Sequence, residues 1–217
     1  MRGRFVTLEG SEGSGKTTAA RHLAEWLHGR GVATIVTHEP GGTPLGEEVR
    51  RIVLHMRDLS DELDPRADAL LFAAARAQHV ARLIRPALER GKWVICARYA
   101  DSSLAYQGHA YGNDLEELRR LQSFATYGLV PDLTVLLDVP VEIGLGRKRQ
   151  GEWNRFEDAE GAGFFERVRA GYLAIAAAEP DRVCVIDASG SVADSDAAIR
   201  EAIAPLLRRE RVDASDA

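Results

Sequence analysis

The segment that decides the fold reads Phe5-Val6-Thr7-Leu8-Glu9-Gly10-Ser11-Glu12-Gly13-Ser14-Gly15-Lys16-Thr17-Thr18. Residues 5–8 form a short run of apolar and β-branched side chains, which predicts a buried strand that ends at Glu9. After Lys16, the positions of Ala20, Leu23 and Leu27 fall on one face of a helix. Between strand and helix lies a full match to the pattern G-x-x-x-x-G-K-[ST]. A glycine-rich loop in this setting predicts an α/β fold with a phosphate-binding turn.

The loop at 10–17 has the chemistry that a chain of phosphates requires. Its glycines let consecutive backbone N–H groups turn inward, and the following helix presents its positive end to the same anion. We expect Lys16 to bridge the outer phosphates of a nucleoside triphosphate, and the Thr17 hydroxyl to bind Mg²⁺, which prefers few protein oxygens. The residues predicted to hold the triphosphate are Gly10, Ser11, Glu12, Gly13, Ser14, Gly15, Lys16 and Thr17, with Thr18 as a weaker candidate.

The rest of the chain alternates short β-branched runs with longer stretches of helical spacing, which is the pattern of βα units around a parallel sheet. Five strands are predicted, at Arg4–Glu9, Ala33–Thr37, Trp93–Ala97, Leu133–Val139 and Arg182–Asp187. Helices are predicted at Lys16–His28, along Leu45–Met56, from Pro65 towards Gly91 with a kink at Pro86, after an Asn113 cap, around Phe165–Ile175 and around Ile199–Leu206. These elements predict one α/β domain over residues 1–217 with a five-stranded parallel sheet.

Composition excludes several classes of protein. The chain has 217 residues and is 45% hydrophobic, which is enough to bury a core without disulfides or a structural metal. Its net charge of -5 argues against nucleic acid as a partner. Cys96 and Cys184 lie in apolar runs and are expected to be reduced core residues, which fits a cytoplasmic location. No segment predicts a membrane span or a signal peptide.

Beyond the loop, the chain carries the segments Glu39-Pro40-Gly41-Gly42-Thr43, Phe72-Ala73-Ala74-Ala75-Arg76, Ala97-Arg98-Tyr99, Ala105-Tyr106-Gln107-Gly108 and Pro131-Asp132-Leu133-Thr134. With the loop, and in this order, these segments resemble the thymidylate kinases, and the resemblance covers nearly the whole chain. It implies a P-loop kinase fold in which ATP, with Mg²⁺, donates its γ-phosphate to dTMP, giving dTDP and ADP for dTTP biosynthesis. It also implies a homodimer, with small molecules as the other partners.

The resemblance further implies an acceptor site rich in arginine. A monophosphate is already ionised near neutral pH, so guanidinium groups matter more than a general base. Arg98 and Arg50 fall where the family contacts the acceptor phosphate, although Arg51 is an alternative to Arg50. Phe72 and Arg76 lie four residues apart and are expected to stack on the pyrimidine and donate to its O4. The other acceptor positions implied are Glu12 near the 3′-hydroxyl, Pro40, Ser103 and Gln107 beside the base, and Tyr106 under the deoxyribose.

A short mobile lid at about 142–158 is also implied by the resemblance. The phosphate loop carries no basic residue at positions 11–14, so we expect the lid to supply charge to the transition state when it closes. Arg149 and Arg155 are expected to contact phosphate, and Arg147 to pack near adenine. A solvated helix face is the alternative interpretation of this charged run. With Lys16 and Arg98, the two phosphate-contacting lid arginines complete the predicted catalytic set.

Two positions depart from the family pattern. Ala97 stands where many members carry an aspartate beside the metal and acceptor, and Glu12, Asp101 and Asp138 are candidates to replace that carboxylate. His38 stands where an arginine commonly precedes the Glu-Pro-Gly-Gly-Thr segment, and we expect it to be a surface residue. The alternative functions are another nucleoside monophosphate or deoxynucleoside kinase, a P-loop ATPase switch, and a kinase-like protein that binds without catalysing.

Overall fold

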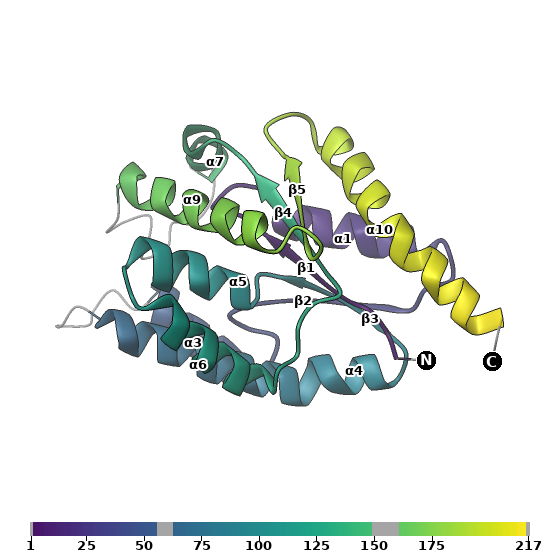
Figure 1. The fold of residues 1–217 in the computed structure, drawn as a ribbon, viewed down its shortest axis with the longest axis horizontal. Helices are drawn as coiled ribbons and strands as arrows, with labels where there is room; N and C mark the ends of the chain where they lie inside the picture. Colours follow the sequence, from purple (N-terminus) through teal and green to yellow (C-terminus); the bar gives the residue numbers. More distant parts are fainter. Residues whose placement is uncertain (1, 56–62, 149–160, 216–217) are drawn as a thin grey trace.

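A sheet of five parallel strands forms the centre of the computed structural model, which describes residues 2–55, 63–148 and 161–215 (Figure 1). The strands are β1 (Phe5–Glu9), β2 (Thr34–His38), β3 (Trp93–Ala97), β4 (Leu133–Asp138) and β5 (Val183–Asp187). Each strand end lies within one residue of its predicted position. The predicted α/β class is therefore confirmed, because every ladder in the sheet is parallel.

The strand order β2-β3-β1-β4-β5 places β1 at the centre of the sheet. On one side Leu8 pairs with Ala97 of β3, and on the other side it pairs with Val135 of β4. From β1 the chain runs to β2 and β3 on one side of the sheet, and from β3 it crosses to β4 and β5 on the other side. The connections that leave the neighbouring strands β1 and β3 therefore run in opposite directions. Such a reversal leaves a crevice in which α/β proteins bind ligands.

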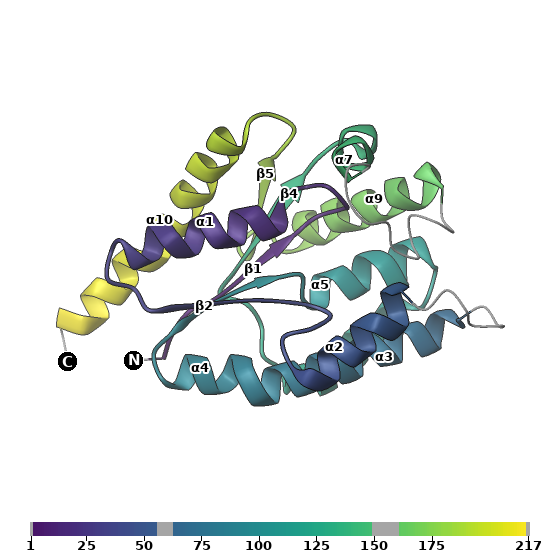
Figure 2. The ribbon, with the colours of Figure 1, turned by 180° about the vertical axis from the view of Figure 1, so that it is seen from behind.

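Helices cover both faces of the sheet. On one face α1 (Lys16–His28) and α10 (Val192–Ser215) lie against each other (Figure 2). The core beneath them contains Leu23, Leu27, Ile199 and Ile203. The other α-helices of the described residues are α2 (Pro44–Arg50), α3 (Pro65–His79), α4 (Arg85–Glu89), α5 (Ala100–Ser103), α6 (Leu115–Thr126), α7 (Val141–Lys148) and α9 (Ala162–Ala178). Of these, α3, α4, α5, α6 and α9 lie on the face opposite α1 and α10 (Figures 1 and 2).

Among the described residues, three π-helical segments continue α-helices: η1 (Arg51–His55) after α2, η2 (Val80–Ile84) between α3 and α4, and η3 (Leu104–Ala110) after α5. The sequence pattern predicted helix at η1 and η2, but it predicted none over α5 and η3. Pro86 explains η2, because proline lacks an N–H and its ring crowds the carbonyl four residues back. The wider π turn just before Pro86 removes that conflict, so the helix continues with a shifted register. Met56, the last residue of the predicted stripe along α2, lies outside the described residues.

The predicted cap of α6 is wrong by one residue. Asp114 accepts a hydrogen bond from the Glu117 N–H at 2.8 Å, whereas Asn113 donates from Nδ2 to the Gln107 carbonyl at 2.7 Å. Both residue types cap helices, so the sequence does not distinguish them. Near the other end of α6, Ala125 is buried and Phe124 is 84% exposed.

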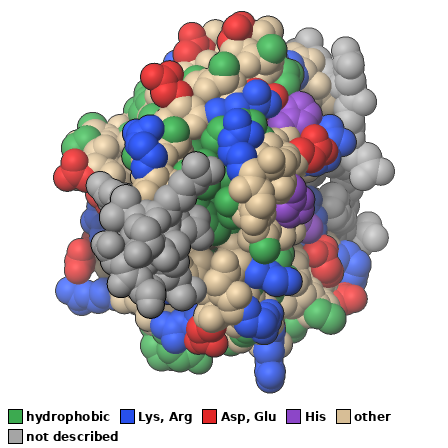
Figure 3. Space-filling view, turned by 90° about the vertical axis from the view of Figure 1, so that its right-hand side faces the viewer, with side chains coloured by type: hydrophobic (Ala, Val, Ile, Leu, Met, Phe, Trp, Pro, Cys, Tyr) green, Lys and Arg blue, Asp and Glu red, His purple; other side chains and the backbone are tan. Residues whose placement is uncertain are grey.

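The structure shows where the two cysteines lie and how charge is distributed on one face. Cys96 is buried in β3 and Cys184 is half-buried, and neither forms a disulfide. On the face drawn in Figure 3, basic and acidic side chains are intermixed. Among the described residues, no helix combines the length and apolar character needed to cross a bilayer.

Candidate active site

A cavity of about 510 Å³ opens where the chain reverses direction, beyond the carboxyl ends of β1 and β3. Several parts of the chain line it: Glu12, Gly13, Gly15, Lys16, Thr17 and Thr18 from the phosphate loop and the start of α1, His38, Glu39, Pro40 and Arg50 from the β2 end and α2, Phe72, Arg98, Ser103, Tyr106 and Gln107 from α3 and the β3–η3 region, and Lys148 from α7. The cavity thus brings the predicted triphosphate loop and most of the predicted acceptor residues together.

The phosphate loop is tightly folded over the start of α1. Gly13 has a φ of 68°, and a Cβ at this position would collide with the Gly144 carbonyl of α7, so only glycine fits. Lys16 is buried and donates from Nζ to the Ser11 carbonyl at 2.7 Å, to Ser14 Oγ at 3.0 Å and to the Gly10 carbonyl at 3.1 Å. Burial, and then repulsion by Arg98, lower the Lys16 pKa to about 7. Phosphates entering the loop would compete for these donors and favour the charged amine.

Arg98 links the end of β3 to the phosphate loop. Its Nη2 donates to Glu12 Oε1 at 2.6 Å and to the Tyr106 hydroxyl at 3.1 Å, and its Nη1 donates to the Gly10 carbonyl at 3.1 Å. Burial alone would raise the Glu12 pKa, but the positive charges of Arg98 and Lys16 outweigh it and hold that pKa below its ordinary value. Glu12 is therefore ionised at neutral pH, and the three charges form one cluster at the cavity wall.

The backbone of Arg98 has a φ of 68°, which is uncommon for a residue with a side chain. Non-glycine residues in this region carry a strain on the order of 1–3 kcal/mol, and they cluster at functional sites. Here the conformation turns the guanidinium back over the end of the sheet, towards the loop after β1.

Glu9, the last residue of β1, was assigned no role from the sequence. It is fully buried and accepts hydrogen bonds from the Tyr99 N–H at 2.7 Å, Ser102 Oγ at 2.6 Å and the Tyr172 hydroxyl at 3.0 Å. Burial, and then the negative charge of Asp101, raise the Glu9 pKa to about 7. The carboxyl group joins β1 to α5 and α9 directly beneath Arg98.

Arg50 and Arg51 point in different directions. Arg50 lines the cavity and donates from Nη1 to the Pro40 carbonyl at 3.1 Å, while Arg51 is exposed and pairs with Glu48 at 3.2 Å. His38 lines the same wall, with about half of its side chain exposed and Glu47 at 3.4 Å. Burial, and then the charge of Arg50, lower the pKa of His38.

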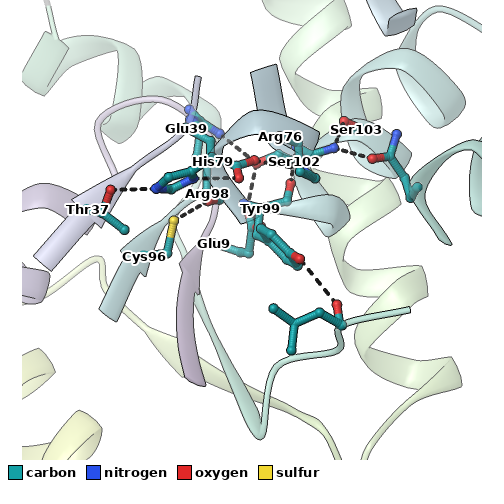
Figure 4. Close-up of polar contacts among 12 residues, drawn as sticks. Glu9, Thr37, Glu39, Arg76, His79, Cys96, Arg98, Tyr99, Ser102 and Ser103 are labelled. Carbon is teal, nitrogen blue, oxygen red and sulfur yellow. Dashed lines mark hydrogen bonds and ion pairs between the residues drawn. The ribbon is translucent and has the colours of Figure 1, made fainter. Parts of the chain in front are cut away.

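Arg76 is 1% exposed and is not among the residues that line the cavity. Its guanidinium is at the centre of a buried network (Figure 4), where Nε donates to Glu39 Oε2 at 2.7 Å. Nη1 donates to Ser103 Oγ at 2.9 Å and to Gln122 Oε1, and Nη2 donates to the Tyr99 carbonyl at 2.8 Å. The network therefore places Arg76 behind Ser103, at the back of the cavity wall.

His79 completes this network. Its Nδ1 forms a hydrogen bond with Glu39 Oε1 at 2.9 Å, and its Nε2 forms one with Thr37 Oγ1 at 2.7 Å (Figure 4). Both hydrogen bonds are buried. Glu39, His79 and Cys96 place one metal-ligand atom each within 4.8 Å of one another. Both His79 nitrogens and both Glu39 oxygens are already engaged in hydrogen bonds, so this cluster serves to join α3 to β2.

The side of the cavity formed by α3 and η3 combines apolar and polar groups. Phe72 is partly buried and Tyr106 is 5% exposed, and both border the cavity. Ser103 is 1% exposed and Gln107 is 2% exposed. An aromatic face beside a few fixed polar groups is the usual wall of a pocket for a flat heterocycle.

The three carboxylates considered as replacements at Ala97 lie in different places. Glu12 borders the cavity. Asp101 binds Arg182 at 2.7 Å, and Asp138 binds Arg169 at 2.7 Å, so each neutralises a structural arginine. Of the three, Glu12 alone lines the cavity.

The predicted lid is only partly described. Arg147, near the end of α7, donates to the carbonyls of Ala188 at 2.8 Å and Ser189 at 2.9 Å, which joins α7 to the loop after β5. Lys148 lines the cavity, although the sequence analysis gave it no role. The predictions for Arg149 and Arg155 concern positions outside the described residues.

The sequence analysis also missed four buried residues that bond the site residues or their neighbours, namely Glu9, Glu39, His79 and Asp68. The last of these accepts a hydrogen bond from Gln107 Nε2 at 2.8 Å. A signal for two of them was present, because Asp68 lies four residues before Phe72 and His79 lies three after Arg76, all on α3. Glu39 and Glu9 carry no such local signal, since their partners lie far along the chain.

Comparisons with known proteins agree with one another. The chain matches the family model described as thymidylate kinase over residues 8–199. It is similar to the protein named thymidylate kinase of Desulfovibrio desulfuricans, with 49% identity over 94% of this chain and 97% of the relative. For the thymidylate kinase of Pseudomonas fluorescens the identity is 46%, over 97% and 100%. For that of Leifsonia xyli it is 51%, over 91% and 93%.

Proposed function

This chain belongs to the thymidylate kinase family and is an ATP-dependent kinase that phosphorylates dTMP to dTDP, and from this premise we propose which residues carry out the transfer. The observation that carries the proposal is the single cavity that joins the phosphate loop to Phe72, Arg50 and Arg98. In the reaction, the bond from the γ-phosphorus to the β-phosphate oxygen breaks and a bond to an acceptor phosphate oxygen forms. The acceptor oxygen is already ionised, so the site has to gather and neutralise charge.

At the donor end, the backbone of residues 10–17 holds the ATP phosphates, and the Lys16 amine contacts the γ-phosphoryl group during its transfer. In the free protein the Lys16 amine is bonded to Gly10, Ser11 and Ser14. These bonds hold the amine beside the loop until phosphate oxygens replace them. Thr18 lies one residue further along α1 and borders the same cavity.

At the acceptor end, Arg98 and Arg50 bind the dTMP phosphate from opposite sides of the cavity. Both guanidinium groups border it. The Nη groups of Arg98 are bonded to Glu12, Tyr106 and Gly10 in the free protein, so the acceptor phosphate replaces some of these partners when it binds the guanidinium. Glu12, held by Arg98, faces the 3′-hydroxyl. Pro40 contributes its side chain to the wall and its carbonyl to the Arg50 contact.

The base binds between Phe72, Ser103 and Gln107, and Tyr106 packs under the deoxyribose. Arg76 acts from behind Ser103. Its Nη2 donates one hydrogen bond, to the Tyr99 carbonyl, and an arginine Nη2 carries two hydrogens, so one N–H is left for the thymine O4. This role requires the base to approach the back of the cavity.

The donor groups at the loop fit Mg²⁺. The exposed Thr17 hydroxyl and the ionised Glu12 carboxylate border one cavity, and Mg²⁺ is usually held by one or two protein oxygens with phosphate oxygens and water. We assign Thr17 as the direct ligand and Glu12 as a partner through water, in place of the carboxylate that Ala97 lacks. When bound, the ion neutralises charge on the transferring phosphoryl group.

The remaining assignments concern the lid and the assembly. We propose a single domain over 1–217 with a lid at about 142–158, in which Arg149 and Arg155 contact phosphate and Arg147 packs near adenine. A homodimer is supported by an exposed apolar area on α3 and α6, where Leu70 is 57% and Phe124 84% exposed. A cytoplasmic location is supported by the two unpaired cysteines.

The test is ADP formation by the purified protein with ATP, Mg²⁺ and each nucleoside monophosphate in turn. We expect dTMP to stimulate turnover above every other acceptor, and Lys16→Met to abolish transfer while circular dichroism shows a retained fold. Stimulation by another monophosphate in preference to dTMP would indicate a different monophosphate kinase, and ATP hydrolysis without an acceptor would indicate an ATPase switch.

A further inference from the structure

Asp68 is a buried carboxylate behind the base side of the cavity. It lies on α3 and is 1% exposed, four residues before Phe72 and eight before Arg76, so that the three residues share one helix face. Its Oδ2 accepts a hydrogen bond from Gln107 Nε2 at 2.8 Å. Gln107 comes from η3 and borders the cavity. The contact therefore connects two elements that face each other across the base site.

This contact decides which end of the Gln107 amide faces the cavity. Because Nε2 donates to Oδ2, the amide turns its N–H group towards Asp68. Gln107 lines the cavity, and its Nε2 is bonded to Asp68, so the amide atom left for a ligand there is the acceptor Oε1. The opposite orientation would place two acceptors against each other in a buried site.

We propose that Asp68 is a positioning residue that sets base specificity by holding the Gln107 amide with Oε1 towards the N3 edge of the pyrimidine. Thymine and uracil carry a hydrogen on N3, which donates to an acceptor, whereas N3 of cytosine is itself an acceptor. The fixed amide thus selects bases with an N3–H and rejects cytosine. This inference rests on the proposed base site and deepens it.

Asp68→Asn tests the inference with almost no change of shape, because an asparagine amide can either donate or accept. Gln107 is then free to turn and present Nε2 to the cavity. The acceptors to compare are dTMP and 5-methyl-dCMP, which share the ring and the methyl group and differ at N3 and the 4-substituent. We expect the ratio of their kcat/KM values to fall about tenfold in Asp68→Asn, with the KM for ATP unchanged.

Asp64→Asn is the matched control, because it makes the same chemical change on the same helix. Asp64 caps α3 by accepting from the Arg66 N–H at 2.8 Å, and asparagine caps equally well. This variant should keep the wild-type ratio. In a Gln107→Leu background, Asp68→Asn should change the ratio no further, because Asp68 acts through Gln107.

Several results would overturn the inference while leaving the kinase activity intact. One is a wild-type ratio in Asp68→Asn, and another is an equal loss with both acceptors, which would make Asp68 merely structural. If Asp68→Asn does not fold, the unmodified protein still gives a test, since equal affinity for dTMP and its N3-methyl derivative would exclude an acceptor at N3. Failure of the wild type to use dTMP at all would instead defeat the proposed function.

Discussion

The Nη2 atom of Arg98 lies 2.6 Å from Oε1 of Glu12, so the residue that follows β3 is ion-paired with the loop that follows β1. β1 and β3 are neighbours in the sheet, and the chain changes its winding direction between them. The pair is mostly buried, with 16% of the Arg98 side chain and 14% of the Glu12 side chain exposed. One ion pair thus couples the predicted donor loop to the predicted acceptor-phosphate ligand.

The strained backbone of Arg98 allows its charge and its conformation to be tested separately. Arg98→Ala and Arg98→Gly both remove the guanidinium, so we expect each to lower kcat/KM for dTMP by about 10²–10³-fold. At a φ of 68° glycine is tolerated and alanine is strained, so Arg98→Gly should be more stable than Arg98→Ala by about 1 kcal/mol. Urea unfolding measures the difference. Equal stability of the two variants would contradict the strain, and retained activity in either would contradict the phosphate role.

Lys16 should make ATP binding take up a proton. Its pKa is lowered to about 7 in the free protein, mainly by burial, and phosphate oxygens favour the charged amine. At pH 8.5 the free amine is largely neutral and becomes protonated on binding, whereas at pH 6 it is already charged. Isothermal titration calorimetry in buffers of different ionisation enthalpy measures the uptake. Lys16→Arg, whose side chain stays charged, should show none at pH 8.5, and unchanged uptake in this variant would assign the proton elsewhere.

Glu9 should make the protein less stable as the pH rises. Burial, and then Asp101, raise its pKa from 4.5 to about 7, so its contribution to stability is complete below pH 4.5 and is lost as the pH rises through 7. The shift corresponds to roughly 3 kcal/mol. Glu9→Gln does not titrate, so its stability relative to wild type should increase between pH 5 and pH 8.5. Urea unfolding at the two pH values checks this, and Glu48→Gln, at an exposed carboxylate, should show no such trend.

The sequence predicted the sheet well because parallel strands are buried on both faces and read as short apolar runs. All five strands were located this way, and Lys16–His28 is the helix predicted and observed. Local periodicity could not choose between Arg50 and Arg51, because one residue turns the side chain by about 100° and a π-helical segment begins at Arg51. The structure alone shows that Arg50 faces the cavity.

Contacts between distant residues account for most of what the sequence could not predict. Spacing on α3 indicated that Phe72 and Arg76 share a face, but Arg76 is bonded to Glu39, 37 residues away in the chain, and lies behind the wall. Glu9 meets the Tyr172 hydroxyl across 163 residues. No periodicity or motif encodes such a pair, because it depends on how separate elements pack.

Removing the charge of Glu39 should destabilise the protein far more than removing an exposed carboxylate. The Arg76–Glu39 pair is 1% and 3% exposed, so Glu39→Gln leaves a buried guanidinium without its counter-charge, at a cost of about 3–5 kcal/mol. Glu48→Gln breaks the exposed pair with Arg51, which is worth about 0–1 kcal/mol. Urea unfolding of the two variants gives the comparison.

The same substitution should also separate positioning of the base from binding of ATP. Glu39 fixes both Arg76 and His79, so its loss loosens α3 against β2 on the acceptor side, while the Lys16 contacts with the phosphate loop are untouched. In the folded fraction of Glu39→Gln, the KM for dTMP should therefore rise about tenfold or more and the KM for ATP should change little. Similar increases in both KM values would show that the network supports the whole site, and an unchanged KM for dTMP would remove Arg76 from base recognition.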